Sequence, residues 1–449
     1  MTRVREVGAR SARRLCLLLG IGATAGCSIL DRALEVEAPS RIIANQLEGP
    51  AAAGLLVKSA ISDFECAFGG YILASGQHGD VFKDGDLAGS YWEVDRREVS
   101  AAGSGFLATQ NCDDLNTIPG IYTPVQTARF EGDQIARRLE GWTDAEVPGR
   151  QLLLATAKAY AGYAMLLLGE SYCSIAIDLG PEIQRLQVLA EAENRFTAAI
   201  AAAQTSNNTA ILNMARVGRA RARLSLAIQN GTVANATLLA AARTDAAAVP
   251  AGFVRNATFA DTPIRRRNQV YNANNVAQTS TIEEDFRGVT DEGVADPRVR
   301  VTDAGRLTFD RVTPLWTQSK YTALGTPIPI ARYAEAQLIV AEVALETGDL
   351  TTATNIINAF HTAAGLPAFA GGTAAQVREH LRGSSQNIVT ERERELFMES
   401  QHLGDKLRYN LPFTPAAGTP YPPKAGGQYG STTCFPLPNV ERFNNPNLN

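Results

Sequence analysis

The sequence predicts a mostly α-helical protein, in which a scaffold of tetratricopeptide-like helix hairpins carries a loop-rich portion. Several long stretches repeat small or apolar residues every three or four positions, which is the period of a helix. A turn signal such as Gly348-Asp349 separates two of these stretches, as in an antiparallel hairpin. Proline, glycine and asparagine concentrate in other stretches, where the helical period disappears, and this is typical of loops.

The composition of the 449-residue chain is that of a folded protein, with 45% hydrophobic and 20% charged residues. The length is sufficient for a large core. A formal net charge of −4 argues against a nucleic-acid-binding surface, which needs a basic patch. Because the chain has only four histidines, we expect no histidine-rich metal centre, and we predict no cofactor.

The N-terminus has the pattern of an export signal. Residues 1–14 hold five arginines and one glutamate, and an apolar run follows from Leu15 to Ala25. This run is shorter than the roughly 20 residues that a transmembrane helix needs. A basic segment before a short apolar run is typical of a secretory signal.

The apolar run ends in Thr24-Ala25-Gly26-Cys27, which resembles a bacterial lipobox, although Thr24 stands where leucine is usual. We therefore expect residues 1–26 to be a lipoprotein signal peptide and Cys27 to carry the lipid that anchors the protein to a membrane. Removal of residues 1–26 would change the net charge from −4 to −8. The alternative is a soluble secreted protein in which this cysteine has no role.

Four cysteines remain once Cys16 and Cys27 are set aside. An even number of cysteines in an exported chain predicts two disulfides, with buried thiols as the alternative. The sequence leaves all three pairings open, and no Cys-x-x-Cys spacing indicates a zinc site. The candidate disulfide cysteines are Cys66, Cys112, Cys173 and Cys434.

The N-terminal region of the mature chain, residues 27–250, is expected to form a helical-repeat scaffold. Two of its predicted helices carry stripes of small residues, which would let a neighbouring helix approach closely. The predicted helices cover residues 151–170, 191–203, 211–229 and 237–248. The stripes are Ala155, Ala159 and Gly162 in the first helix and Ala215, Gly218 and Ala222 in the third.

The glycine-rich residues 71–117 are expected to form a loop-rich insertion in that region. In residues 251–449 we expect a loop-rich segment at 251–330, a helix hairpin at 332–364, a helix at about 388–408 and a proline-rich tail. The hairpin spans 33 residues, close to the roughly 34 of a tetratricopeptide unit, and an ordinary helix bundle is the alternative. Because ligands often bind to loops on a rigid frame, these loops are candidate binding regions.

Five short motifs, which follow one another in the same order, resemble those of the SusD/RagB nutrient-uptake lipoproteins. The resemblance covers residues 290–449 well and 118–230 more loosely, and Ser400 and His402 depart from the usual glycine and arginine. The five motifs are Asp296-Pro297-Arg298; Arg332-Tyr333-Ala334-Glu335 with Ala341-Glu342; Ile356, Asn358 and Ala364-Gly365-Leu366-Pro367; Ile388, Glu391, Arg392, Glu395, Leu396, Phe397, Glu399, Asp405, Leu407 and Arg408; and Phe435-Pro436-Leu437-Pro438 with Glu441 and Asn445-Pro446-Asn447-Leu448.

This resemblance implies a SusD-like α/α superhelix and a binding protein rather than an enzyme. It implies a protein that is lipid-anchored in the bacterial outer membrane and faces the cell exterior. Such proteins capture an oligosaccharide or similar nutrient and deliver it to a TonB-dependent, SusC-like transporter. A peptide ligand is also compatible with the resemblance. The alternative function is a helical-repeat envelope lipoprotein that acts as an assembly scaffold without a small ligand.

Candidate ligand-binding residues are aromatic and polar side chains in the predicted loops. Sugar rings present apolar faces that pack on aromatic rings, and hydroxyls that bond to polar groups. The alternative for each aromatic residue is a loop anchor packed on the scaffold. The candidates are Tyr91, Trp92, Trp316, Tyr321, Asp84 and Arg96.

A catalytic role is not expected. Glu283-Glu284-Asp285 could supply the paired carboxylates of a glycoside hydrolase, but adjacent acidic residues in a charged loop are usually solvated. The acidic residues Asp80, Asp84 and Asp86 lack the twelve-residue calcium loop with its terminal glutamate. We therefore predict no metal site there.

Overall fold

A computed structural model describes residues 47–87, 89–102, 110–112, 120–384, 389–421 and 426–448, without the side chains of residues 89–91. The expected signal peptide and Cys27 lie outside the described residues. The contacts divide the chain into residues 1–52 and 53–449. The described part of the first unit includes the 3₁₀ helix Pro50–Ala52. All other elements belong to the second unit.

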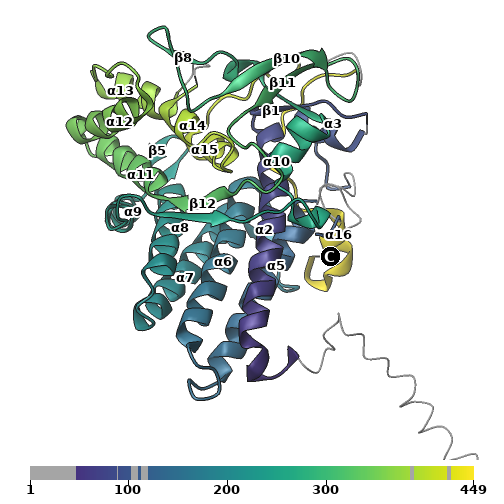
Figure 1. Cartoon of the computed structure of the whole chain (residues 1–449), viewed down its shortest axis with the longest axis vertical. Coiled ribbons are helices and arrows are strands. Elements are labelled where there is room, and N and C mark those ends of the chain that lie inside the picture. Colours follow the sequence, from purple (N-terminus) through teal and green to yellow (C-terminus); the bar gives the residue numbers. More distant parts are fainter. Residues whose placement is uncertain are drawn as a thin grey trace, which may run out of the picture. The chain divides into compact units, whose positions relative to one another are not determined.

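The second unit is built mainly from helices, as the sequence predicts. Each long helix packs on the one that follows it, which is how helical repeats build a continuous core (Figure 1). These helices are α2 Ala53–His78, α5 Tyr122–Gly141, α6 Arg150–Ser171, α7 Arg185–Thr205, α8 Thr209–Ala227, α9 Ala236–Ala247, α11 Tyr333–Glu346, α12 Leu350–Ala364 and α13 Ala374–Arg382.

The small residues predicted to line α6 and α8 let these helices approach α7 closely. Gly162 of α6 and Gly218 of α8 both face the ring of Phe196, and a Cβ at either glycine would come within 3.0 Å of it. Phe196 also meets Tyr163 edge to face, with ring centroids 4.9 Å apart.

Among the described helices, α6 alone has the length and hydropathy of a membrane span, and 83% of that stretch is buried within this core.

Residues 71–78 are the end of α2 and not the beginning of a loop, contrary to the expectation for residues 71–117. The glycines read as loop signals are points of close packing instead. A Cβ on Gly76 would lie within 3.0 Å of the Phe82 ring, and one on Gly85 would lie within 3.0 Å of the Thr308 side chain. Glycine is therefore needed there for space, whereas the sequence alone suggests flexibility.

The helix expected at about 388–408 is interrupted in the structure. It forms two short helices, α14 Glu391–Glu395 and α15 His402–Tyr409. Between them Met398 and Ser400 adopt positive φ angles of 58° and 84°, which no helix accommodates. The charged residues from 391 to 395 fit a helix, and nothing in the sequence pattern after them indicates this turn.

The loop-rich portion is held by short antiparallel strand pairs. Figure 1 places β1, β10, β11 and α3 (Gly89–Asp95) beyond the C-terminal end of α2. The strand pairs are β1 Phe82–Asp84 with β7 Ser280–Ile282, β2 Ser174–Ala176 with β3 Glu182–Gln184, β4 Ile228–Gln229 with β5 Thr232–Val233, β6 Val254–Ala257 with β12 Ile328–Arg332, β8 Thr290–Asp291 with β9 Val294–Ala295, and β10 Val301–Leu307 with β11 Pro314–Gln318. The remaining short elements are α10 Gln269–Tyr271, α16 Asn439–Asn444, the π-helical turn Asn272–Val276, and 3₁₀ turns at Ile264–Arg266, Glu284–Phe286 and Pro446–Leu448.

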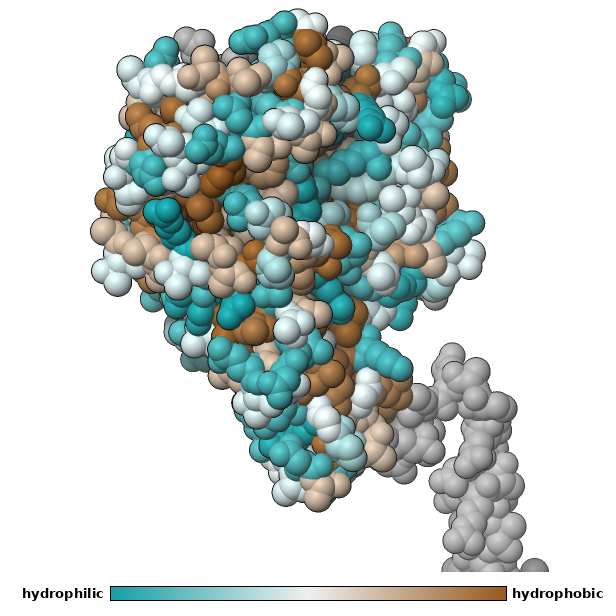
Figure 2. Space-filling view, turned by 60° about the vertical axis from the view of Figure 1, so that its left-hand side comes forward, coloured by the Kyte–Doolittle hydropathy of each residue, from teal (hydrophilic) through white to brown (hydrophobic). Residues whose placement is uncertain are grey.

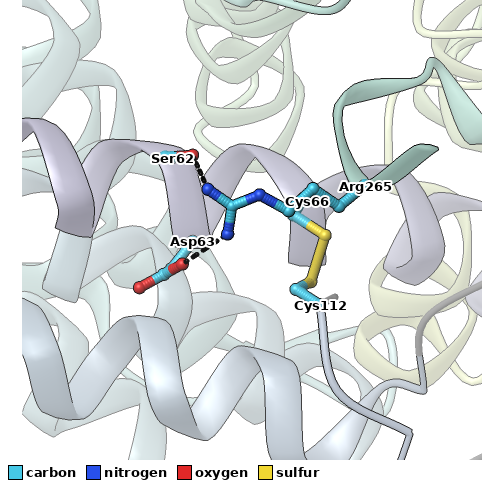
Figure 3. The surroundings of a disulfide bond; sticks show 5 residues. All are labelled: Ser62, Asp63, Cys66, Cys112 and Arg265. Atoms are coloured by element: carbon cyan, nitrogen blue, oxygen red, sulfur yellow. Dashed lines mark hydrogen bonds and ion pairs between the residues drawn. A yellow bond between two sulfur atoms is a disulfide. The ribbon is translucent and has the colours of Figure 1, made fainter. Parts of the chain in front are cut away.

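Two disulfides join distant parts of the chain, as predicted, and the structure selects one of the three pairings. Cys66 of α2 bonds to Cys112, beside an ion pair between Asp63 and Arg265 of 3.9 Å (Figure 3). Cys173 bonds to Cys434, 261 residues away, and so holds the C-terminal tail against the end of α6. Cross-links of this kind restrict the unfolded chain.

Buried and half-buried charged side chains form two clusters that we call the buried charge network: the first ties the loop-rich portion to α14 and the turn after it, and the second joins α11, α13, α14 and α15. In the first cluster Arg332 contacts Glu395 and Glu399, each at 2.7 Å, and Arg298 contacts Glu391. The first cluster is Asp296, Arg298, Lys320, Arg332, Glu391, Glu395 and Glu399. The second cluster is Glu342, Arg382, Arg392, Asp405 and Arg408.

Loss of one partner from this network is expected to cost more than loss of a surface ion pair. Arg332→Met takes one of two cations from each carboxylate. Glu395 keeps Arg298 at 3.3 Å and Glu399 keeps Lys320 at 2.6 Å, so we expect unfolding free energy to fall by about 3 kcal/mol. The control is Arg243→Met, because the Arg243–Asp349 pair is more than 40% exposed and about 1 kcal/mol or less is expected. Chemical denaturation measures both values, and equal losses would contradict a structural role for the network.

Candidate functional site

Three loops come together beyond the C-terminal end of α2, and we call them the loop platform: residues 82–97, 276–287 and 301–318. Backbone hydrogen bonds join them. The Gly85 amide donates to the Thr279 carbonyl at 2.9 Å, the Phe309 amide donates to the Gln278 carbonyl at 2.8 Å, and the Asp310 amide donates to the Gly85 carbonyl at 2.8 Å. Gly85 also packs on Thr308 too closely for a Cβ. The platform is thus one connected surface.

Apolar side chains are exposed on this platform to an unusual degree. Phe309 is 52% exposed and Leu87 is 59% exposed, although both are large and apolar. Val276, Leu307 and Val312 are exposed to similar extents. The face shown in Figure 2 has apolar residues in small separate patches on a mixed surface. Because Leu307, Phe309 and Val312 lie close together in the sequence, their exposure makes this part of the platform a candidate for binding.

Trp92 and Trp316, two of the predicted ligand-binding residues, both lie on the platform and are half-buried. Trp92 belongs to α3, and its indole nitrogen donates to the Asp86 carbonyl at 3.4 Å. Trp316 lies in β11, and the Arg287 guanidinium stands 5.0 Å from the centre of its ring. Each ring is therefore held in place by one polar neighbour.

The other predicted residues have different surroundings. Asp84 is fully buried in β1, and Tyr321 is buried with its hydroxyl donating to the Met398 carbonyl at 3.0 Å. Arg96 is half-buried, bonds to the Gly426 carbonyl at 3.2 Å and pairs with Glu98 at 2.6 Å. Tyr91 lies in α3, but its side chain is outside the described residues. Sequence reasoning could not separate these positions from the half-exposed tryptophans.

The three adjacent acidic residues do not form a converging pair of carboxylates. The Glu283 side chain is buried, 3.8 Å from Lys83, whereas the Glu284 side chain is 78% exposed and pairs with Arg287. Burial raises the pKa of Glu283 to about 7. Lys83 acts to lower this pKa, and the charges of Asp95 and Asp80 act to raise it. The two side chains therefore differ in exposure, one lying in the interior and the other in solvent.

A concave surface lies on the scaffold. It is a pocket of about 370 Å³ between α5, the loop after β2, and α16. Its polar lining is paired: Arg129 contacts Asp178 at 2.6 Å, and the Tyr122 hydroxyl donates to Glu441 at 3.1 Å. Phe130 is 40% exposed at its edge. No sequence pattern indicates this pocket, because its walls come from three distant segments.

One group of described side chains has the types and closeness that a metal ion requires. It consists of His361, His380 and Glu391, in the C-terminal helices.

The conserved pattern of one family matches residues 187–448, more than half of the chain. The chain belongs to the SusD family. Three solved structures show how much of this chain has the fold of the family. A SusD-like carbohydrate-binding protein from Bacteroides vulgatus has a TM-score of 0.64 and 16% identity, with 89% of this chain and 97% of that chain covered.

A SusD homologue from Bacteroides thetaiotaomicron has a TM-score of 0.65 and 13% identity, with 92% and 99% of the two chains covered. A surface glycan-binding protein A from Bacteroides uniformis has a TM-score of 0.60 and 14% identity, with 88% and 98% covered. Among curated proteins, none matches the chain. At these identities the structures establish the SusD-like fold.

Three of the five SusD-family motifs in this chain supply residues of the buried charge network. Asp296 and Arg298 of the first motif, Arg332 of the second and Glu391 of the fourth all belong to its first cluster. The motifs therefore hold the frame together, and none of these side chains lies on the loop platform. This explains why the motifs identify the family but do not locate a binding residue.

Phe309 is the residue on the platform that the sequence analysis missed. It lies in the turn between β10 and β11, whereas the aromatic candidates predicted from the sequence were tyrosines and tryptophans. Leu307 ends β10, and Phe309 and Val312 lie in the connection that follows it. Apolar residues at the tip of a hairpin, where polar ones are usual, were the available signal.

Replacement of Glu283 is expected to stabilise the SusD-family chain in a pH-dependent way. The folded state keeps the Glu283 carboxyl protonated up to about pH 7. The unfolded chain loses the proton near pH 4, so wild-type stability falls as pH rises between these values. Because glutamine stays neutral, we expect the advantage of Glu283→Gln to grow by on the order of 2 kcal/mol from about pH 5 to about pH 8.

Denaturant titrations at several pH values measure this difference. The matched control is Glu284→Gln, whose side chain is exposed and whose effect is expected to stay flat with pH. The same flat profile for Glu283→Gln would contradict a raised pKa at that position.

Proposed function

We propose that this SusD-family protein captures glycans on the loop platform. The observation that carries the proposal is the exposed apolar group around Phe309, on the same hydrogen-bonded loop platform as the half-buried Trp92 and Trp316. An exposed aromatic ring can pack on the apolar face of a sugar, and nearby peptide and side-chain polar groups can bond to its hydroxyls. The similar proteins from Bacteroides vulgatus and Bacteroides uniformis, described as carbohydrate-binding and glycan-binding, support this ligand class.

The proposal includes delivery of the glycan to a TonB-dependent, SusC-like transporter of the outer membrane. A lipid on Cys27 would keep the protein at the outer face of that membrane, beside the transporter. Family membership supports both steps. The proposal is for binding without catalysis, because the Glu283 side chain is buried whereas the Glu284 side chain is exposed. Scaffolding without a ligand is the alternative, but it offers no role for the exposed hairpin tip.

Removal of one aromatic ring tests where the glycan binds. We expect Phe309→Ala and Trp316→Ala each to weaken binding of the best glycan found on an array by about ten-fold or more, the loss that follows when a central aromatic contact is removed. Calorimetry on the purified protein measures the change. Circular dichroism verifies that each variant is folded.

Phe443→Ala is the matched control, because Phe443 is 77% exposed but lies on α16 beside the Tyr122 pocket. Its effect on glycan affinity is expected to stay below about two-fold. A loss with Phe443→Ala and none with Phe309→Ala would move the binding site to that pocket and overturn the proposal.

Delivery is tested separately by purification from detergent-solubilised outer membrane through a C-terminal tag. We expect a TonB-dependent transporter to co-purify in equal amount with the wild type, and the amount recovered to fall when Cys27→Ala removes the anchor. Co-purification of envelope-assembly proteins instead would favour the scaffold function.

A further inference from the structure

Three side chains with metal-ligating atoms converge between the C-terminal helices. His361 lies on α12, His380 on α13 and Glu391 at the start of α14. Figure 1 shows these three helices on the opposite side of the upper part from α3 and β10 of the loop platform. Half of the four histidines of the chain are therefore in one cluster.

The separations of the three atoms match the ligand triangle of a tetrahedral zinc ion. His361 Nε2 lies 3.1 Å from Glu391 Oε2 and 3.3 Å from His380 Nε2, and His380 Nε2 lies 3.8 Å from Glu391 Oε2. Ligands about 2.0–2.1 Å from a tetrahedral ion are separated by about 3.3–3.4 Å. A point about 2.1 Å from all three atoms lies out of the plane of this triangle, as the ion of a tetrahedral site does.

The surrounding residues hold the two rings in this arrangement. His361 Nδ1 lies 2.5 Å from the Pro367 carbonyl, to which it donates, and this directs Nε2 toward Glu391. The His380 ring stacks on Phe369, with centroids 4.0 Å apart and an angle of 15°. The two imidazoles are tilted by 51°, so they meet through their Nε2 edges and do not stack. Outer contacts of this type are usual around metal-binding histidines.

The Glu391 carboxylate is also held in position. Arg298 bonds to both of its carboxylate oxygens, one of which, Oε2, faces the histidines. The guanidinium orients the carboxylate while reducing its charge. His380 is 18% exposed, whereas His361 and Glu391 are buried, so an ion could enter beside His380.

We propose that His361 Nε2, His380 Nε2 and Glu391 Oε2 bind a zinc ion, with water as the fourth ligand. Two imidazoles and one carboxylate favour zinc over calcium or magnesium, which prefer oxygen ligands. The described cysteines Cys66, Cys112, Cys173 and Cys434 are bonded in disulfides and do not compete for the ion. The ion would join α12, α13 and α14 and is independent of glycan capture.

The competing arrangement is a hydrogen-bonded cluster without metal. In that arrangement a proton on His361 Nε2 bridges to Glu391 Oε2, and His380 is a neighbour only. The two arrangements differ in the role of His380: it is a ligand in the first and dispensable in the second.

Metal titration of the purified, chelator-stripped full chain separates the two arrangements. We expect wild-type protein to bind one equivalent of Zn²⁺ by calorimetry, and to give the intense visible absorption of tetrahedral Co²⁺ when Co²⁺ is supplied instead. His380→Ala is expected to weaken Zn²⁺ binding by about 100-fold. The matched control is His402→Ala, since His402 is the other partly exposed histidine and lies outside the cluster, beside Glu393.

The proposal is overturned if wild type binds no Zn²⁺ or if His380→Ala binds as tightly as wild type. Equal losses for His402→Ala and His380→Ala would overturn it as well, since they would show non-specific histidine binding. If His380→Ala does not fold, anomalous scattering from zinc-soaked wild-type crystals decides: a peak between the three ligand atoms supports the site, and no peak there refutes it.

Discussion

The rest of the structure depends on the point where the two clusters of the buried charge network meet. Glu391 and Arg392 are adjacent in the chain but belong to different clusters. Glu391 contacts Arg298 of the loop-rich portion, whereas Arg392 contacts Asp405 at 2.8 Å and Glu342 of α11 at 3.7 Å. Removing charges from water is costly, so each must be matched by its partners. The network therefore fixes one arrangement of the loops on the helices.

This frame explains how exposed loops can be held in a defined shape. The stems of the loop platform are tied down by Asp80, which contacts Arg97 at 2.7 Å and Lys406 at 2.6 Å, both buried. The Cys173–Cys434 disulfide holds the tail that packs beside them. Because contacts at the stems stabilise the loops, the side chains at the hairpin tip are not needed for stability and can contact a ligand.

Glu391 also links the frame to the histidine cluster. Burial alone would raise its pKa, but hydrogen bonds from His361 and Arg298 outweigh burial and lower the pKa to about 2. A carboxylate that stays ionised inside the protein needs positive partners on both sides. Arg298 supplies one, and the other side is open to a proton on His361 or to a metal ion. The same residue thus serves the fold and the proposed zinc site.

The sequence by itself determined the family, the helical scaffold and the presence of two disulfides. These follow from local periodicity, from the number of cysteines and from motifs whose charged residues must be buried together. Tertiary structure alone decided the disulfide pairing, the helical end of α2 and the turn at Met398 and Ser400. It also decided which aromatic residues are exposed: Tyr321 is buried and Phe309 is not. The exposure of a side chain, and which side chains come together, depend on contacts between segments that are far apart in the sequence. The residues next to a side chain in the sequence do not determine those contacts.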